Sequence, residues 1–158
     1  MKKFILPLTS LLAVSAFSIP QAFAASDVYD NYAELSSHYH QGTDYTIETQ
    51  SKTDDVIVLA IHGGRIEKGT DQLAKAIAQD DHSYYIFNAL IYEDSNNDGR
   101  NDLHLTSTHF DEPTALKMTT QKHKVVSIHG AAGDDPIVYM GGRKFNEQYF
   151  KQIVSCRF

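Results

Sequence analysis

The chain has 158 residues, of which 42% are hydrophobic and 22% are charged, and its formal net charge at pH 7 is −6. This size suits one compact domain. The acidic balance argues against binding to nucleic acid or to an anionic membrane through long-range attraction. The only cysteine is Cys156, so an internal disulfide is excluded and stability must come from packing or from a bound metal.

Residues 1–24 have the three-part pattern of a secretory signal peptide. Two lysines precede an apolar stretch, and small residues at Ala22 and Ala24 suit a cleavage site. The alternative, a membrane anchor, needs about 20 uninterrupted apolar residues, whereas serines and a proline interrupt this stretch. We therefore predict that the mature chain, residues 25–158, is a single domain and that it is secreted or periplasmic.

The first half of the mature chain predicts a loop or short helix, two strands and a helix. Residues 45–49 alternate like a half-buried edge strand. Residues 56–61 are a continuous apolar, β-branched run, which is typical of a central strand buried on both faces. Thr70 is a candidate N-cap for a helix that continues to Gln79, because apolar residues recur there at helical spacing.

The second half predicts three further strands, at 83–91, 102–107 and 125–130. Between the last two, residues 112–121 predict a short helix with Pro113 in its first turn. Strands that alternate with helices indicate an α/β fold with a mostly parallel or mixed sheet flanked by helices.

Two predicted strands each end in a histidine, at His62 and His129. A catalytic zinc ion takes three protein ligands, and ligands in such sheets lie at the carboxyl ends of the strands. Gly63 and Gly64 allow a tight turn, so that Glu67 can return to the same ion as His62. The sequence thus predicts a zinc site of His62, Glu67 and His129. The competing interpretation is that the glycines only form a turn and that His62 is a hydrogen-bonded core residue.

A second histidine cluster lies around His104, with His109, Asp111 and Glu112 close by in the sequence. His104 precedes a loop, where it could orient a substrate carbonyl or carboxylate. An alternative is that His104 is a solvated histidine of an edge strand, and the sequence does not decide between the two.

The acidic segment 93–103 has part of the pattern of a calcium loop, with oxygen-bearing side chains at its first, third, fifth and ninth positions. These residues are Asp94, Asn96, Asp98 and Asp102. The twelfth position is Leu105 in place of the usual glutamate, so the EF-hand pattern is incomplete. A solvated turn is the alternative, because Asn, Asp and Gly also form turns.

Four ordered motifs show a resemblance to a known family. They are HGGRIEKGT at 62–70, LHLTSTHFDEP at 103–113, VVSIHG at 125–130 and VYMGG at 138–142. In order and approximate spacing they resemble the poly-γ-glutamate hydrolase family, found in bacteriophages and bacteria, whose members are often labelled phage-related replication proteins.

The resemblance implies a zinc carboxypeptidase-like fold and hydrolysis of γ-glutamyl amide bonds in a polymer or peptide. Its metal ligands fall on His62, Glu67 and His129, and its zinc would polarise the scissile carbonyl and activate a water molecule. Because the substrate would be a polyanion, Arg65 beside the zinc is expected to help reverse the local charge, and His104 to contact the substrate.

The sequence departs from the family pattern after the GG motif. The family continues through an Asn and an Arg suited to substrate carboxylates, and then a strand with the general-base Glu, whereas this sequence stops at Phe158. We therefore expect a C-terminally truncated domain whose catalytic base is unknown and whose hydrolysis is impaired. The alternatives are a non-catalytic, zinc-containing module that binds carboxylate or peptide ligands, and a purely structural domain whose motifs are turns.

Overall fold

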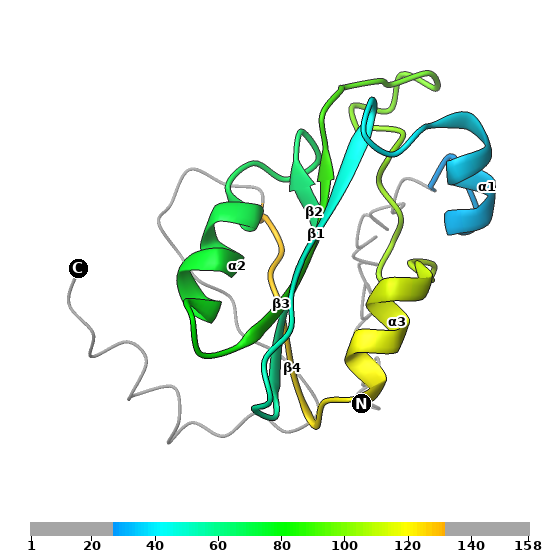
Figure 1. Cartoon of the computed structure of the whole chain (residues 1–158). Coiled ribbons are helices and arrows are strands. Elements are labelled where there is room, and N and C mark those ends of the chain that lie inside the picture. Colours follow the sequence, from blue (N-terminus) through cyan, green and yellow to red (C-terminus); the bar gives the residue numbers. More distant parts are fainter. Residues whose placement is uncertain (1–26, 132–158) are drawn as a thin grey trace, which may run out of the picture.

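The computed structural model describes residues 27–131, which form a mixed four-stranded sheet in the order β1-β3-β2-β4. β1 (Tyr45–Gln50) is antiparallel to β3 (Ser83–Ala89). β2 (Val56–Gly64) runs parallel to both β3 and β4 (Lys124–Ser127). The α/β prediction is confirmed, with β2 inside the sheet and β1 at its edge (Figure 1).

Helices cover both faces of this sheet (Figure 1). α2 (Thr70–Ala78) lies on one side, and α1 (Tyr32–His38) and α3 (Pro113–Thr120) lie on the other. None of the helices between residues 27 and 131 has the length and apolar character needed to cross a membrane.

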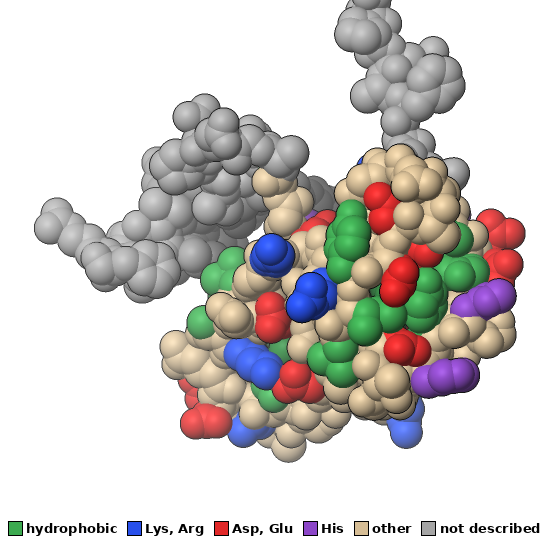
Figure 2. All heavy atoms as spheres, turned by 90° about the horizontal axis from the view of Figure 1, so that it is seen from above, with side chains coloured by type: hydrophobic (Ala, Val, Ile, Leu, Met, Phe, Trp, Pro, Cys, Tyr) green, Lys and Arg blue, Asp and Glu red, His purple; other side chains and the backbone are tan. Residues whose placement is uncertain are grey.

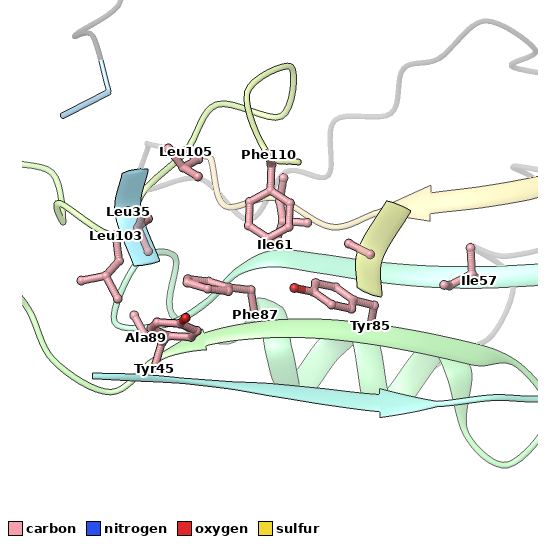
Figure 3. Close-up of a cluster of buried hydrophobic side chains, with 11 residues drawn as sticks. Leu35, Tyr45, Ile57, Ile61, Tyr85, Phe87, Ala89, Leu103, Leu105 and Phe110 are labelled. Atoms are coloured by element: carbon pink, nitrogen blue, oxygen red, sulfur yellow. The ribbon is translucent and has the colours of Figure 1, made fainter. Parts of the chain in front are cut away.

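The larger hydrophobic core lies between the sheet and the two helices α1 and α3. Aromatic residues of β1 and β3 stack there, with a distance of 4.7 Å between the ring centroids of Tyr45 and Phe87. A segment between β3 and α3 contributes Leu103, Leu105 and Phe110 to this core (Figure 3). The smaller core, under α2, contains Val58, Ala60, Ala74, Ala78 and Ile86.

The segment at 102–107 is not a strand, so that prediction is wrong. Leu103 and Leu105 alternate with polar residues and are fully buried, which reproduces the strand pattern. The backbone N–H groups of this segment, however, donate to side chains instead of to a neighbouring strand. Leu103 N–H donates to Asn101 Oδ1 at 3.1 Å, and Thr106 N–H donates to Asp27 Oδ2 at 2.6 Å. The segment is an irregular loop that the core and these two side chains hold in place.

Thr70 is the first residue of α2 and not its N-cap, which is Gly69 in a left-handed conformation. The Thr70 hydroxyl instead donates to the carbonyl oxygens of Glu67, at 2.8 Å, and His62, at 3.2 Å. For α3 the first-turn proline is confirmed, and Glu112 caps the helix by accepting from the N–H groups of Thr114 and Ala115.

Three parts of the sequence prediction lie outside the described residues. These are the signal peptide at 1–24, the VYMGG motif at 138–142 and Cys156.

Candidate metal centre

His62 lies at an irregularity near the end of β2. Ala60 pairs with Ile86 and Gly63 with Asn88, so β2 contains one residue more than β3 between these pairs. Such a bulge changes the direction in which side chains point, and bulges are common beside active sites. As a result, two consecutive side chains of β2 lie on the same side of the sheet. Ile61 packs in the core that contains the 103–110 segment, and His62 contacts that segment through Leu105.

The turn after His62 depends on glycine. Gly64 has φ +65°, and a Cβ there would lie 2.3 Å from the carbonyl oxygen of Ala89. The backbone thus turns against β3, where the N–H of Arg65 donates to the same Ala89 oxygen at 3.0 Å. The N–H of Glu67 then donates to the His62 carbonyl at 2.8 Å, which returns Glu67 to His62 as the sequence predicted.

Hydrogen bonding fixes which ring nitrogen of His62 is available to bind a metal ion. Nε2 is 2.8 Å from the carbonyl oxygen of Leu105, an atom that can only accept, so Nε2 carries the proton. Nδ1 then has the lone pair, and it is 3.0 Å from Oε1 of Glu67. Metal-binding histidines characteristically donate their second ring N–H to a carbonyl or carboxylate in this way.

His129, two residues beyond β4, brings its own Nδ1 to the same point. This atom is 3.2 Å from Nδ1 of His62 and 3.7 Å from Oε2 of Glu67. Two ligands of one tetrahedral zinc ion at about 2.0–2.1 Å lie about 3.3–3.4 Å apart. The two Nδ1 atoms fit this separation, and the Glu67 carboxylate approaches them with different oxygens, Oε1 at 3.0 Å from His62 and Oε2 at 3.7 Å from His129. The structure thus brings together the three residues that the sequence selected.

The loop after β4 passes close to Glu67, which explains why a glycine follows His129. Gly130 N–H donates to Oε2 of Glu67 at 2.7 Å, and a Cβ on Gly130 would lie 3.2 Å from Cβ of Glu67. On the other side, Nε2 of His129 is 2.9 Å from Oγ of Ser127. Both contacts fix the direction in which His129 presents Nδ1.

His104 belongs to a second group that could hold a metal. His62, Glu67 and His104 offer ligand atoms that all lie within 4.8 Å of one another. The His104 ring, however, is stacked on the His62 ring, with centroids 4.2 Å apart and planes inclined by 26°. An ion must lie near the plane of each imidazole that binds it, so the inclined ring of His129, at 67° to His62, suits a shared ion better.

The ionisation states also suit a metal. Burial alone would raise the pKa of Glu67, but the contacts with the His62 ring and with the N–H of Gly130 lower it below its usual value of 4.5. Burial, followed by the nearby His62, lowers the pKa of both His104 and His129 below the usual 6.5. At neutral pH the carboxylate is ionised and these two imidazoles are neutral, which are the forms that bind metal ions.

The family model described as poly-gamma-glutamate hydrolase matches residues 29–155. The chain belongs to this poly-gamma-glutamate hydrolase family. In Bacillus subtilis (strain 168), UPF0714 protein YndL is 40% identical over 132 residues, covering 84% of this chain and 50% of YndL. The SPbeta prophage-derived UPF0714 protein YoqZ of the same strain is 37% identical over 141 residues, covering 89% of this chain and 48% of YoqZ.

Two solved structures of the family have similar folds. A zinc-free apo form of YndL is 44% identical with a TM-score of 0.62, covering 70% of this chain and 51% of that one. A bacteriophage poly-gamma-glutamate hydrolase is 34% identical with a TM-score of 0.61, covering 67% of this chain and 49% of that one. The chain thus spans about half the length of these relatives.

The loops around the centre of this hydrolase-family chain also contain the other predicted residues. The exposed Arg65 lies between His62 and Glu67, and its role in substrate binding stays a prediction. Asn101 supports its backbone: Nδ2 donates to the carbonyl oxygens of Ile91, at 2.8 Å, and Arg65, at 3.4 Å. Sequence reasoning missed Asn101 because it resembles the turn-forming residues around it.

The acidic 94–102 loop is held by its own hydrogen bonds. Asp94 accepts from the N–H groups of Asp98 and Gly99, and Asn96 Oδ1 also accepts from Asp98 N–H. Asp102 is buried and accepts from Ser95 N–H and from the Tyr39 hydroxyl. A turn explains all of these bonds without an ion, and calcium binding stays a prediction.

The residue most completely missed is Asp27. Its carboxylate accepts from groups of Thr106 and from the rings of His104 and His109. Burial would raise its pKa, but the hydrogen bonds, first that from Thr106 N–H, bring it below the usual 3.8. A lone aspartate close to a predicted signal peptide has no pattern that would reveal this role.

Proposed function

We propose that this chain binds zinc through His62, Glu67 and His129 and hydrolyses γ-glutamyl amide bonds of poly-γ-glutamate or γ-glutamyl peptides. The observation that carries the proposal is the convergence of two Nδ1 atoms and a carboxylate at separations of 3.0, 3.2 and 3.7 Å. Membership of the family supports the substrate class. For the relative YndL, the solved structure is a zinc-free apo form, and this supports the choice of metal.

A zinc ion would polarise the scissile carbonyl and lower the pKa of a bound water molecule. The residues of the chain would do the rest. The carbonyl oxygen of Leu105 fixes the tautomer and direction of the His62 ring, and Oγ of Ser127 fixes the direction of the His129 ring. His104, half-buried beside His62, would contact the substrate, and the exposed Arg65 would attract its carboxylates. We assign no general base, because none of the residues from 27 to 131 has been matched to that role.

The charge of the surface bears on a polyanionic substrate. Figure 2 shows the molecule from above, the side of the loops that follow β2 and β3, with acidic and basic side chains interspersed. With a formal net charge of −6, the chain as a whole would not attract a polyanion. Local cations, the metal and Arg65, must therefore provide the attraction.

We also propose that the protein acts outside the cytoplasm, in the periplasm or the medium. The support is the sequence pattern of residues 1–24. Mass spectrometry of the N-terminus of the exported protein tests this proposal. A mature chain that begins at Ala25 is the expected result, and an intact Met1 on exported or cytoplasmic protein would contradict it.

Metal analysis tests the zinc site directly. We expect about one zinc per chain in the wild type and a large loss in His129→Ala, because two remaining ligands hold zinc poorly. His123→Ala is the matched control, since His123 is exposed and pairs with Asp55 away from the centre. Equal, negligible zinc in all three proteins would contradict the proposal.

Activity needs a separate test. The purified chain is incubated with poly-γ-glutamate and, in parallel, with α-linked poly-glutamate, and fragments are followed by gel filtration. Fragments only from the γ-linked polymer, lost on chelation and restored by zinc, are the expected result. If the general base lies in a part of the relatives that this chain does not span, the rate will be lower by about 10² to 10⁴.

A second candidate function is a zinc-containing module that binds carboxylate or peptide ligands without cleaving them. It is kept because no residue between 27 and 131 is assigned as the general base. Zinc binding and retention of poly-γ-glutamate, with no fragments released, would select this function over hydrolysis.

A further inference from the structure

Asp27 is a buried carboxylate that the metal centre does not use directly. Its side chain is only 2% exposed, yet it is close to the start of the described chain. Four groups surround it within 3.1 Å, and all belong to the loop 77 to 82 residues further along. They are Nδ1 of His104 at 2.9 Å, Nδ1 of His109 at 3.1 Å, and the N–H and Oγ1 of Thr106 at 2.6 and 3.1 Å.

The same loop, residues 104–109, contacts the metal centre with its other side. The carbonyl oxygen of Leu105 fixes Nε2 of His62 at 2.8 Å. The ring of His104 lies on that of His62, and Oγ of Ser107 is 3.5 Å from Nε2 of His129. The loop therefore connects Asp27 to both proposed histidine ligands.

Among residues 27–131, the loop has few other hydrogen-bond partners that fix its polar groups. Its backbone makes turn hydrogen bonds within 101–110, such as His104 N–H to Asn101 and His109 N–H to Thr106, and it pairs with none of the strands β1 to β4. The buried side chains of Leu103 and Leu105 anchor it to the core, but apolar contacts do not direct hydrogen bonds. A carboxylate that accepts several hydrogen bonds is directional, and such charged bonds are stronger than neutral ones.

We propose that Asp27 is a positioning residue for the metal centre. Its carboxylate holds His104 as the Nδ1–H tautomer, so that Nε2 is left for the substrate side. It also holds the backbone of the 104–109 loop so that Leu105 can orient His62. The inference rests on the proposed function for its connection to zinc, but not for the Asp27–His104 contact itself.

Zinc affinity provides the first test, measured on the full-length protein by competition with a chromophoric chelator. Asp27→Ala should weaken zinc binding by about 10- to 100-fold, the usual effect of losing a residue that orients a ligand. Asp27→Asn keeps one acceptor oxygen and should lie between Asp27→Ala and the wild type. Asp30→Asn, an exposed aspartate of the same segment, is the matched control and should leave affinity unchanged. Equal affinity in Asp27→Ala and wild type, with both folded by circular dichroism, would overturn the inference.

The tautomer of His104 provides a second test that does not need zinc. Long-range ¹H–¹⁵N NMR spectra of the zinc-free protein distinguish the two neutral forms of each histidine. His104 should be the Nδ1–H form in the wild type and should lose it in Asp27→Ala. If Asp27→Ala does not fold, Asp27→Val is used, since valine is close to aspartate in size but has no acceptor oxygen, and a fixed Nδ1–H signal unchanged by that variant overturns the inference. If the wild type binds no zinc, the proposed function fails, while this measurement still decides whether Asp27 orients His104.

Discussion

The turn at residues 62–70 contains His62 and the loop at residues 104–109 contacts it, but the two segments are held in place in different ways. The turn is closed by bonds among its own residues: Glu67 and Thr70 both donate to the His62 carbonyl oxygen. The loop is held by Asp27, 77 residues before His104. The bonds that close the turn lie within one continuous motif, whereas Asp27 lies far from the motif that contains the loop, so only part of what supports a metal centre is visible in the sequence.

Gly64→Ala should produce the largest loss of stability, because it breaks the turn. The left-handed φ of +65° and the 2.3 Å approach to the Ala89 oxygen each cost about 1–3 kcal/mol, so we expect a loss of about 3 kcal/mol or more in the free energy of unfolding. Gly42→Ala is the control: its φ is +91° with nothing within 4 Å, and it should lose only about 1 kcal/mol. Urea unfolding measures both, and equal losses would show that the contact with Ala89 is unimportant.

Leu105→Ala tests how firmly the core holds the loop. Leu105 is fully buried, so truncation should reduce the free energy of unfolding by about 3 kcal/mol. Leu116→Ala, at a side chain that is 49% exposed, should change it by no more than about 0.5 kcal/mol. Similar urea midpoints for the two variants would mean that Asp27 alone fixes the loop.

The fold could be predicted from the sequence wherever the burial of a helix or strand determined its pattern of apolar residues. The apolar run at 56–61 predicted a central strand because β2 is covered on both faces, and it lies between β3 and β4. The prediction failed at 102–107 because two buried leucines on an irregular loop have the same spacing as alternate residues of a strand. Periodicity reports which side chains are buried, and it cannot report where the backbone hydrogen bonds go.

The same reasoning applies to the candidate site. His62, Glu67 and His129 could be chosen because the two histidines end apolar runs and Glu67 follows a glycine turn, and the structure brings their side chains together. Asp27 and Asn101 could not be chosen, because their partners lie elsewhere in the chain and their own surroundings are those of ordinary loop residues.

The pH dependence of the zinc-free protein distinguishes the two regions further. Asp27 and Glu67 have pKa values below their usual 3.8 and 4.5, so their stabilising contributions are complete above these values and are lost as the pH falls through the folded-state pKa. His104 and His129 resist protonation in the folded state, so stability should begin to fall below pH 6.5.

Urea unfolding at a series of pH values measures this dependence. Asp27→Asn should have a flatter curve below pH 3.8, whereas Asp30→Asn should follow the wild type. Parallel curves for Asp27→Asn and wild type in that range would mean that the Asp27 carboxylate contributes no pH-dependent stability.

Apart from the control variants, Thr70→Val should have the smallest effect, and it tests whether the turn is as self-contained as its hydrogen bonds suggest. Valine keeps the shape of threonine but removes the hydroxyl that donates to Glu67 and His62, so the free energy of unfolding should fall by about 1 kcal/mol. Thr70→Ser keeps the hydroxyl and should recover most of the loss. Zinc affinity should fall by less than in Asp27→Ala, because the bond from Glu67 N–H to His62 still closes the turn. A larger loss of zinc affinity in Thr70→Val than in Asp27→Ala would reverse the comparison and make the turn the more fragile support of the centre.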